Sequence, residues 1–381
     1  MSKLVIRDFA HISDASIEFG DLTVLVGAQG TGKSLVLQWL KTAIDGRQII
    51  SALRDAGQDV RNPDALIDLI FGVGMGEAWH EGRTSVTLDG KSIRPAGIRK
   101  LGGGEERVFF IPAHRAMLIS DGWAAPFQKL TADTPVVARL FSQNLFDRFS
   151  AREGDSLFPL DRVLKKQYRD LIDDAVFHGG NVGLEQDRQH ANRLKLTHGS
   201  SQLPFMTWTA GQREFTPLLL GLYHLLPPRK MNKQPDIEWV VIEEPEMGLH
   251  PQAVTVFMLL VLDLLWRGYK VALSTHSPLV LTVVWALRRL RESGARWQRV
   301  CEAFGVKGNQ QLKKVAEVAL TKDMRTYLMS FDDAGHVQSK DVSSLDPSAE
   351  DQDISGWGGL TGFSSRFGEA VRAAANEQDQ T

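Results

Sequence analysis

Residues 27–34, with the sequence GAQGTGKS, combine three glycines, a lysine and a hydroxyl in a spacing that suits phosphate. Glycine lets backbone N–H groups approach an anion closely, because it has no Cβ. The N-terminus of a following helix would add partial positive charge. The Lys33 ammonium can pair with β- and γ-phosphate oxygens, and the Ser34 hydroxyl can ligate Mg²⁺. The segment predicts a phosphate-binding loop, the alternative being a glycine-rich turn before a helix.

The surroundings of this segment favour the phosphate-binding loop. The buried-strand pattern LTVLV precedes it and the amphipathic helix pattern SLVLQWLKTAI follows it, which is the context that the motif requires. The sequence therefore predicts a nucleotide held by Gly27, Ala28, Gln29, Gly30, Thr31, Gly32, Lys33, Ser34 and Leu35.

A second group of reactive side chains lies in the stretch VVIEEPEMGLHP, directly after an apolar run. Glu243, Glu244 and Glu246 repel one another, so they need a compensating cation or exposure to solvent. In phosphate-loop NTPases the acid that ends a buried strand reaches the Mg²⁺, which predicts that Glu243 is the metal acid. Glu244 would face the γ-phosphate and act as general base on the attacking water. The alternative is a solvated acidic loop.

Two further motifs suit the binding of anions. The strand pattern KVALS is followed by THSP, which places His276 at the carboxyl end of a strand, where α/β sheets bind ligands. That histidine can hydrogen-bond a γ-phosphate, the alternative being a structural role. The segment TAGQREFTPLLL begins a long helix with Thr209, Ala210 and Gly211, which gives a second N-terminus suited to an anion.

The elements that must position these groups follow from periodicity. The first thirty residues predict three strands, and TSVTLDGKSIR (84–94) predicts a hairpin turning at Asp89-Gly90. Residues 116–178 are largely helical in pattern, and 180–199 predict a second hairpin. Strands then alternate with long helices, which indicates an α/β fold with parallel strands. From about residue 332 the chain loses periodicity and is rich in Asp, Ser and Gly, as in a tail.

The composition is that of a globular protein. Of the 381 residues, 43% are hydrophobic and 24% are charged, and the net charge of −2 gives no global preference for nucleic acid or anionic membranes. Cys301 is the single cysteine, which fits the reducing cytoplasm. We find no signal peptide pattern, and the most apolar window, AVTVFMLLVLDLLW, is interrupted by Asp263 and shorter than the ~20 residues of a membrane span. We expect a cytoplasmic protein without a membrane partner.

The order of these motifs resembles the ABC-type ATPase domain, with TAGQ similar to its signature motif. LVIRDFAHISDASIEFGDLTVLVGAQGTGKS, FIPAHR, EEPEMGLHP and STHSP resemble the SMC/RecF and OLD-like branch of that family, over roughly residues 3–290. The resemblance implies an α/β ABC-ATPase head, with a mixed central sheet carrying the phosphate loop, an antiparallel β lobe and an inserted helical lobe. The expected units are an N-terminal ATPase lobe, a helical insertion with β-hairpin, a C-terminal ATPase lobe and a tail, over residues 1–115, 116–208, 209–331 and 332–381.

The resemblance also implies a mechanism with ATP and Mg²⁺. Two copies would bind head to tail, so that Thr209, Gly211 and Gln212 of one copy contact the nucleotide held by the other. Ser34 and Glu243 would hold the metal. Lys33, Glu244 and His276 would be the catalytic residues, with Glu244 as the base and His276 as the switch histidine.

The sequence departs from the family pattern at four points. Glu243 replaces the usual aspartate, although OLD-like heads often read EEPE, and Ala210 replaces a glycine of the signature. His250 stands where transporters carry an aspartate. The segment after FFIP has Ala113, His114 and Arg115 but no evident glutamine of the kind the family uses there. These changes affect the expected hydrolysis rate or coupling more than nucleotide binding.

The cellular role is less specified. Residues 35–208 contain no long coiled coil, and residues 300–381 are too few for the toprim domain of OLD-family nucleases. We therefore expect a separately encoded effector, a nuclease or toxin, regulated by this ATPase in anti-phage defence or DNA repair. The alternatives are a slow ATPase acting as an oligomeric scaffold, or a transporter ATPase. A basic stretch contains Arg288, Arg289, Arg291, Arg296 and Arg299; such a stretch is usually a solvated helix face, and the alternative is a contact with DNA.

Overall fold

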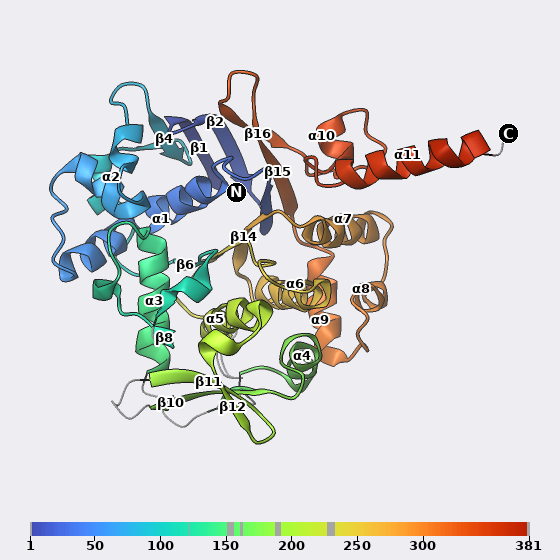
Figure 1. Ribbon diagram of the computed structural model, residues 1–381. Helices are drawn as coiled ribbons and strands as arrows, with labels where there is room; N and C mark the ends of the chain where they lie inside the picture. Colours follow the sequence, from blue (N-terminus) through green and yellow to red (C-terminus); the bar gives the residue numbers. More distant parts are fainter. Residues whose placement is uncertain are drawn as a thin grey trace.

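The computed structural model describes residues 2–120, 122–150, 156–160, 163–186, 192–226 and 233–378. Its centre is a ten-stranded sheet with helices on both faces (Figure 1). The strand order is β5-β4-β1-β2-β16-β15-β3-β14-β13-β6. The strands are β1 (Ser2–Phe9), β2 (Ile12–Phe19), β3 (Leu22–Val26), β4 (Ser85–Leu88), β5 (Lys91–Ile93), β6 (Val108–Ile111), β13 (Trp239–Glu243), β14 (Lys270–Thr275), β15 (Met324–Phe331) and β16 (Val337–Asp341).

The sheet is mixed, as the sequence predicts. Strands β15, β3, β14, β13 and β6 run parallel, whereas β1, β2, β4 and β5 form antiparallel pairs. Side chains of β3 alternate between two apolar cores: Leu22, Val24 and Val26 face one core and Leu25 faces the other. A strand covered on both faces needs apolar residues throughout, which explains the unbroken LTVLV pattern.

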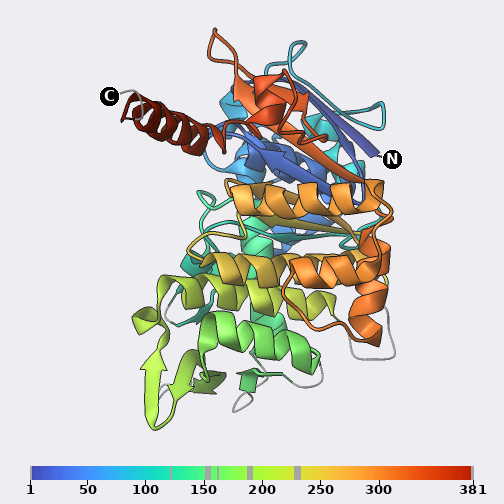
Figure 2. The same cartoon turned by 90° about the vertical axis from the view of Figure 1, so that its right-hand side faces the viewer.

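Helices fill the two faces of the sheet. Helices α1 (Lys33–Asp55) and α2 (Pro63–Phe71) belong to the core that contains β1 and β2. The opposite core contains α5 (Ala210–Leu225), α6 (Pro251–Trp266), α7 (Pro278–Glu292), α8 (Trp297–Ala303) and α9 (Gln310–Ala319). Figure 2 shows α6 and α7 packed side by side. Helix α6 is the apolar window of the sequence and is almost wholly buried, and no helix among the described residues could cross a membrane.

A smaller lobe lies at the other end of the molecule from β1, β2 and β16 (Figures 1 and 2). It contains α3 (Val136–Phe149), α4 (Lys166–Ile172) and a four-stranded sheet. The sheet's strands are β9 (Ser156–Phe158), β10 (Asn181–Gln186), β11 (Asn192–His198) and β12 (Ser201–Pro204). The hairpin predicted over 180–199 corresponds to β10 and β11, and its connecting residues 187–191 lie outside the described residues. A short pair, β7 (Ile119–Ser120) and β8 (Trp123–Ala124), lies near α3.

The C-terminal segment is more ordered than its composition indicates. Strand β16, within the expected tail, pairs with β15 and β2 inside the main sheet. Helix α10 (Gln352–Ser355) follows, and the indole of Trp357 is buried and donates a hydrogen bond to the Leu345 carbonyl at 2.9 Å. Helix α11 (Gly362–Gln378) then extends away from the body (Figure 1). Residues 332–360 are therefore part of the folded body, and the expectation of a tail beginning at 332 is corrected there.

Candidate active site

The loop between β3 and α1 is shaped by glycine. Gly30 and Gly32 both have φ of 75°, in the left-handed region that other residues rarely adopt. Gly27 approaches the chain so closely that an added Cβ would lie 2.1 Å from the Met329 carbonyl oxygen. Helix α1 begins at Lys33, directly after Gly32, so its free N–H groups face the loop. The local geometry is therefore that of an anion cradle at a helix N-terminus.

Lys33 is folded back onto this loop. Its ammonium donates hydrogen bonds to the carbonyls of Gly27 at 3.0 Å and Ala28 at 2.8 Å. Burial lowers the pKa of Lys33 to about 8, against the opposing effect of the carboxylates of Glu244 and Glu246. A bound phosphate would replace the weak carbonyl acceptors with a full negative charge, which favours the charged lysine.

Glu243 ends β13 in a fully buried position. Its Oε2 accepts a hydrogen bond from the Ala113 N–H at 3.2 Å, while Oε1 has no partner among the described residues. Burial raises the pKa of this carboxyl to about 7, although hydrogen bonds from Ser34 and Ala113 act in the opposite direction. A buried carboxylate with a free oxygen next to a serine hydroxyl is a donor set that suits Mg²⁺.

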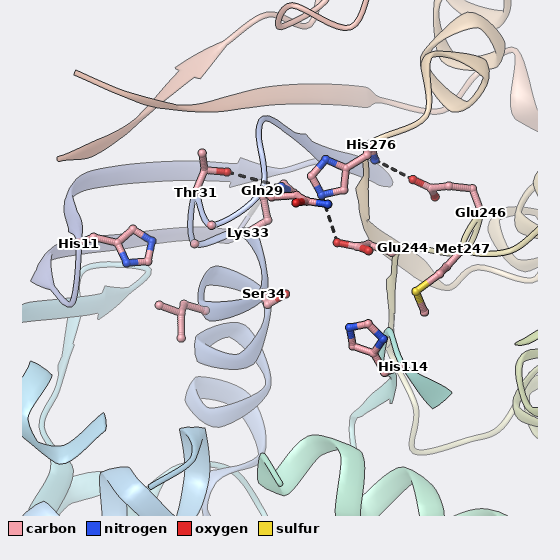
Figure 3. Close-up of a pocket in the computed structure, with 13 residues that line it drawn as sticks. His11, Gln29, Thr31, Lys33, Ser34, His114, Glu244, Glu246, Met247 and His276 are labelled. Atoms are coloured by element: carbon pink, nitrogen blue, oxygen red, sulfur yellow. Dashed lines mark hydrogen bonds and ion pairs between the residues drawn. The ribbon is translucent and has the colours of Figure 1, made fainter. Parts of the chain in front are cut away.

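Glu244 and His276 meet at neighbouring strand ends (Figure 3). The imidazole Nε2 of His276 lies 3.2 Å from Oε1 of Glu244. Glu244 has a φ of 39°, a strained left-handed value for this residue, and its N–H donates to the Ser274 carbonyl at 3.0 Å. That strain turns the side chain out of β13 toward the ring.

Glu246 fixes the histidine loop from the other side. Its Oε1 accepts hydrogen bonds from the Thr275 hydroxyl at 2.7 Å and the His276 backbone N–H at 2.6 Å. Its Oε2 is buried without a partner among the described residues. The three glutamates therefore have three different environments, and none of them is a freely solvated acid, which excludes the simple acidic loop.

A cavity of about 740 Å³ connects these groups. Figure 3 shows Lys33, Ser34, Glu244 and His276 around it. It is lined by His11, Gln29, Gly30, Thr31, Gly32, Lys33, Ser34, Leu35, His114, Glu244, Glu246, Met247 and His276. Most of the nucleotide contacts expected from the sequence thus face one space, and Gly27 and Ala28 lie behind it and bind Lys33.

The residues of the TAGQ motif lie elsewhere. Thr209 caps α5, with Gln212 completing a capping box, and the Cβ that Gly211 lacks would lie 3.1 Å from the Gly248 carbonyl oxygen. None of these three is among the described residues that line the cavity. Thr209 and Ala210 are exposed. The role of this motif at the nucleotide of a second copy stays a prediction.

Some residues at the site were not among those that the sequence motifs predict. His11, His114 and Met247 line the cavity, yet each is a single residue in a loop without a recognisable spacing. Arg115 is completely buried and donates hydrogen bonds to the carbonyls of Pro112, Glu214, Glu243 and Pro245. It holds the turn after β13 in place. The only signal for this arginine is an isolated charge after the apolar run FFIPA.

Residues 136–282 match a protein-family model described as "AAA domain, putative AbiEii toxin, Type IV TA system". The matched segment runs from α3 into α7 and includes the TAGQ motif, the acidic end of β13 and His276. Together with the phosphate loop on β3, it places the expected motifs in order on one mixed sheet. The fold is an α/β fold with a mixed central sheet and a separate antiparallel sheet. No curated protein sequence matches the chain.

The chain is similar to solved SMC heads at low sequence identity. The SmcHead bound to the C-winged helix domain of ScpA is 12% identical, with 89% of this chain and 96% of that chain covered and a TM-score of 0.45. The SMC head domain from Thermotoga maritima is 13% identical, with 89% and 97% covered and a TM-score of 0.36. An Smc head domain from Pyrococcus furiosus, bound to the C-terminal domain of ScpA, is 11% identical, with 90% and 96% covered and a TM-score of 0.37.

The structure shows the local surroundings of two residues that depart from the pattern of the family that the sequence resembles. His250 caps α6, because its Nδ1 accepts a hydrogen bond from the Gln252 N–H at 3.3 Å. The backbone of Ala210 lies close to Gly248, whose φ of 70° favours glycine.

Several arginines of the basic stretch, which begins within α7 and runs into α8, form ion pairs. Arg288 and Arg289 form ion pairs with Glu292, and Arg289 also pairs with Asp346. Arg299 pairs with Glu302. These contacts fit the solvated-face alternative, and DNA contact stays a prediction.

Proposed function

We propose that this protein binds ATP with Mg²⁺ and hydrolyses it. The observation that carries the proposal is that the ends of three parallel strands meet at two adjoining cavities. Lys33 and Ser34 follow β3 at the start of α1, Glu243 ends β13 with Glu244 directly after it, and His276 directly follows β14. A lysine, a hydroxyl and a metal-binding carboxylate, with a second carboxylate to position water, are groups that phosphate-loop NTPases use in phosphoryl transfer.

The residues present fit a magnesium ion. Ser34 and Glu243 would hold it together with phosphate oxygens, and the unpartnered Oε1 of Glu243 is the oxygen free to do so. The bound ion would supply positive charge against the developing charge on the phosphates and would offset the crowding of the acids. A carboxyl with its pKa near 7 then favours its charged form.

The chain's own residues divide the remaining work. Lys33 would bind the β- and γ-phosphates, with the loop N–H groups around them. Glu244 would accept the proton of the attacking water, and the Glu244–His276 contact of 3.2 Å would orient the carboxylate. Glu246 holds the His276 backbone in position.

We further propose that the working site includes a second copy of the chain. The exposed N-terminus of α5 at Thr209 offers N–H groups that face no nucleotide of their own chain. Beside it lies a groove of about 480 Å³ whose lining includes Met117 and Met206, which are 78% and 69% exposed. Exposed methionines next to an anion-ready helix end support a protein contact there.

The biological role follows as a proposal from the family description. The description names a type IV toxin–antitoxin system, and within such a system we propose a regulatory ATPase that acts on a separately encoded nuclease or toxin. A slow ATPase acting as an oligomeric scaffold is the second candidate, supported by the groove beside α5 with its exposed Met117 and Met206, which suits a protein contact. Turnover that rises with DNA or a viral protein favours the regulator, and negligible turnover in a stable ATP-bound oligomer favours the scaffold.

Two variants test the ATPase proposal directly. We expect Lys33→Ala to weaken ATP binding at least about 100-fold, because a buried charge-assisted contact to phosphate is lost. Glu244→Gln should keep ATP affinity and lower the hydrolysis rate about 100-fold or more, because the general base is removed. Calorimetric binding and phosphate release measure the two effects. Unchanged ATP affinity in Lys33→Ala contradicts the assignment of the phosphate loop.

A further inference from the structure

A second cavity, of about 440 Å³, adjoins the nucleotide cavity. Ser34, His114 and Glu244 line both, so the two spaces meet at the metal side of the phosphate loop. We call this second space the metal-side cavity. The other residues that line it include Gln38 from α1, Glu243 from β13 and the apolar side chains of Leu118, Leu130 and Val137.

Gln38 is a polar residue of this cavity to which the proposed binding and hydrolysis of ATP assign no role. It is 6% exposed and lies four residues after Ser34, so both side chains are on the same face of α1. Its neighbours Val36, Leu37, Trp39 and Leu40 are fully buried apolar residues. The amide oxygen of Gln38 is buried and has no hydrogen-bond donor in the described part of the chain. An unmet buried acceptor is destabilising, so a donor from outside the protein is indicated.

A second buried oxygen that lacks a partner within the ranges that the structure describes belongs to the carboxylate of Glu243. Its Oε1 is also buried without a partner among the described residues, and it lines the same cavity. A magnesium ion held by Ser34 and Glu243 would serve the Glu243 oxygen directly, which leaves the Gln38 oxygen in need of a hydrogen-bond donor. Waters bound to a divalent cation are such donors, because the cation polarises their O–H bonds, and Mg²⁺ usually keeps several of its waters.

We propose that the side-chain oxygen of Gln38 accepts a hydrogen bond from a water on the Mg²⁺ of the bound nucleotide, which makes Gln38 a positioning residue of the metal site. The proposal rests on the proposed binding of Mg²⁺ and ATP. The proposal gives a reason for the buried amide of Gln38 among apolar neighbours on α1, one turn after Ser34.

The same helix offers a matched control. Gln48 also belongs to α1 and also has a buried side-chain oxygen without a partner among the described residues. It lines neither the nucleotide cavity nor the metal-side cavity. Replacing either glutamine by leucine therefore removes an unmet acceptor from the same helix, but only Gln38 faces the proposed metal shell.

The experiment is a calorimetric titration of a non-hydrolysable ATP analogue into wild type, Gln38→Leu, Gln38→Glu and Gln48→Leu, at several Mg²⁺ concentrations and in EDTA. We expect Gln38→Leu to raise the Mg²⁺ concentration needed for tight binding about 10- to 100-fold, the usual effect of losing an outer-shell partner. Affinity in EDTA should stay at the wild-type value. Gln38→Glu should restore the magnesium response because it keeps an acceptor oxygen, and Gln48→Leu should match wild type throughout.

Three outcomes overturn the inference in distinguishable ways. A wild-type magnesium response in Gln38→Leu shows that this residue does not contact the metal shell, and leaves the proposed function intact. Equal weakening of binding with Mg²⁺ and in EDTA shows a structural role instead. If wild type itself binds no nucleotide, the proposed function fails first and the inference fails with it.

Discussion

At the scale of single residues, burial disfavours the charged forms of both Lys33 and Glu243 in the site. Lys33 has its pKa lowered to about 8 and Glu243 has its pKa raised to about 7, both mainly through desolvation. Motif spacing in the sequence was sufficient to bring Lys33, Ser34 and Glu244 together as candidates. It was not sufficient for Gln38 or Arg115, because their significance depends on an unmet oxygen and on carbonyls contributed by distant segments.

These two groups predict how nucleotide affinity depends on pH. The pKa of Glu243 in the folded protein, about 7, lies above the ordinary value of 4.5, so Glu243 takes up a proton below about pH 7. Because the protonated carboxyl binds the metal poorly, metal binding weakens as the pH falls below the neutral range. Above about pH 8 Lys33 loses its proton, because its pKa lies below the ordinary value of 10.5. Affinity for the ATP analogue in the presence of Mg²⁺ should therefore peak between about pH 7 and 8 and fall up to tenfold per pH unit on each side.

Glu243→Gln separates this effect from ionisation of the nucleotide itself. The variant cannot titrate at position 243, so the acidic limb that Glu243 contributes should disappear while the alkaline limb due to Lys33 persists. Calorimetry from pH 6 to 9 measures both limbs. An acidic limb of the same size in the variant contradicts the assigned role of Glu243.

At the scale of elements, local patterns predict the strands and helices around the site but not every pairing. The strand pattern LTVLV and the helix after the phosphate loop are found as β3 and α1. Strand β16 was missed, since VQSKD has little apolar character and its position depends on β2, where Val337 pairs with Ile12 from the other end of the chain. Pairing across such a separation leaves no periodic signal in either segment.

Asp45 is the residue that joins α1 to β6. Its carboxylate accepts hydrogen bonds from the N–H groups of Arg107 and Val108, and pairs with the buried Lys41 ammonium at 2.8 Å. Asp45→Ala should lower the free energy of unfolding by ~3–5 kcal/mol, because it leaves a buried cation and two amides poorly compensated. Asp55→Ala, an exposed change at the end of the same helix, should stay within about 0.5 kcal/mol of wild type. Urea denaturation measures both, and equal values would contradict the role of Asp45.

At the scale of the whole molecule, the mixed sheet places the phosphate loop, the acids and the histidine at the carboxyl ends of neighbouring strands. The N-terminus of α5 does not line the nucleotide cavity that these groups surround. The sequence predicts the class of fold because the motifs occur in a fixed order on alternating strands and helices. It cannot by itself show which parts of the site come from another copy, since that depends on surfaces. The central claim is therefore that Thr209 of one copy completes the site built around Lys33 of another.

The most direct test of this claim mixes two inactive variants. Lys33→Ala removes the phosphate contact, whereas Thr209→Asp adds a repelling charge at the end of α5 and keeps a good helix cap. A mixed dimer would contain one intact site, so an equal mixture should recover about a quarter of the wild-type ATPase rate, because half of the dimers are mixed and each has one working site of two. A mixture that stays as inactive as its components, or a Thr209→Asp variant with full activity alone, would contradict the composite site.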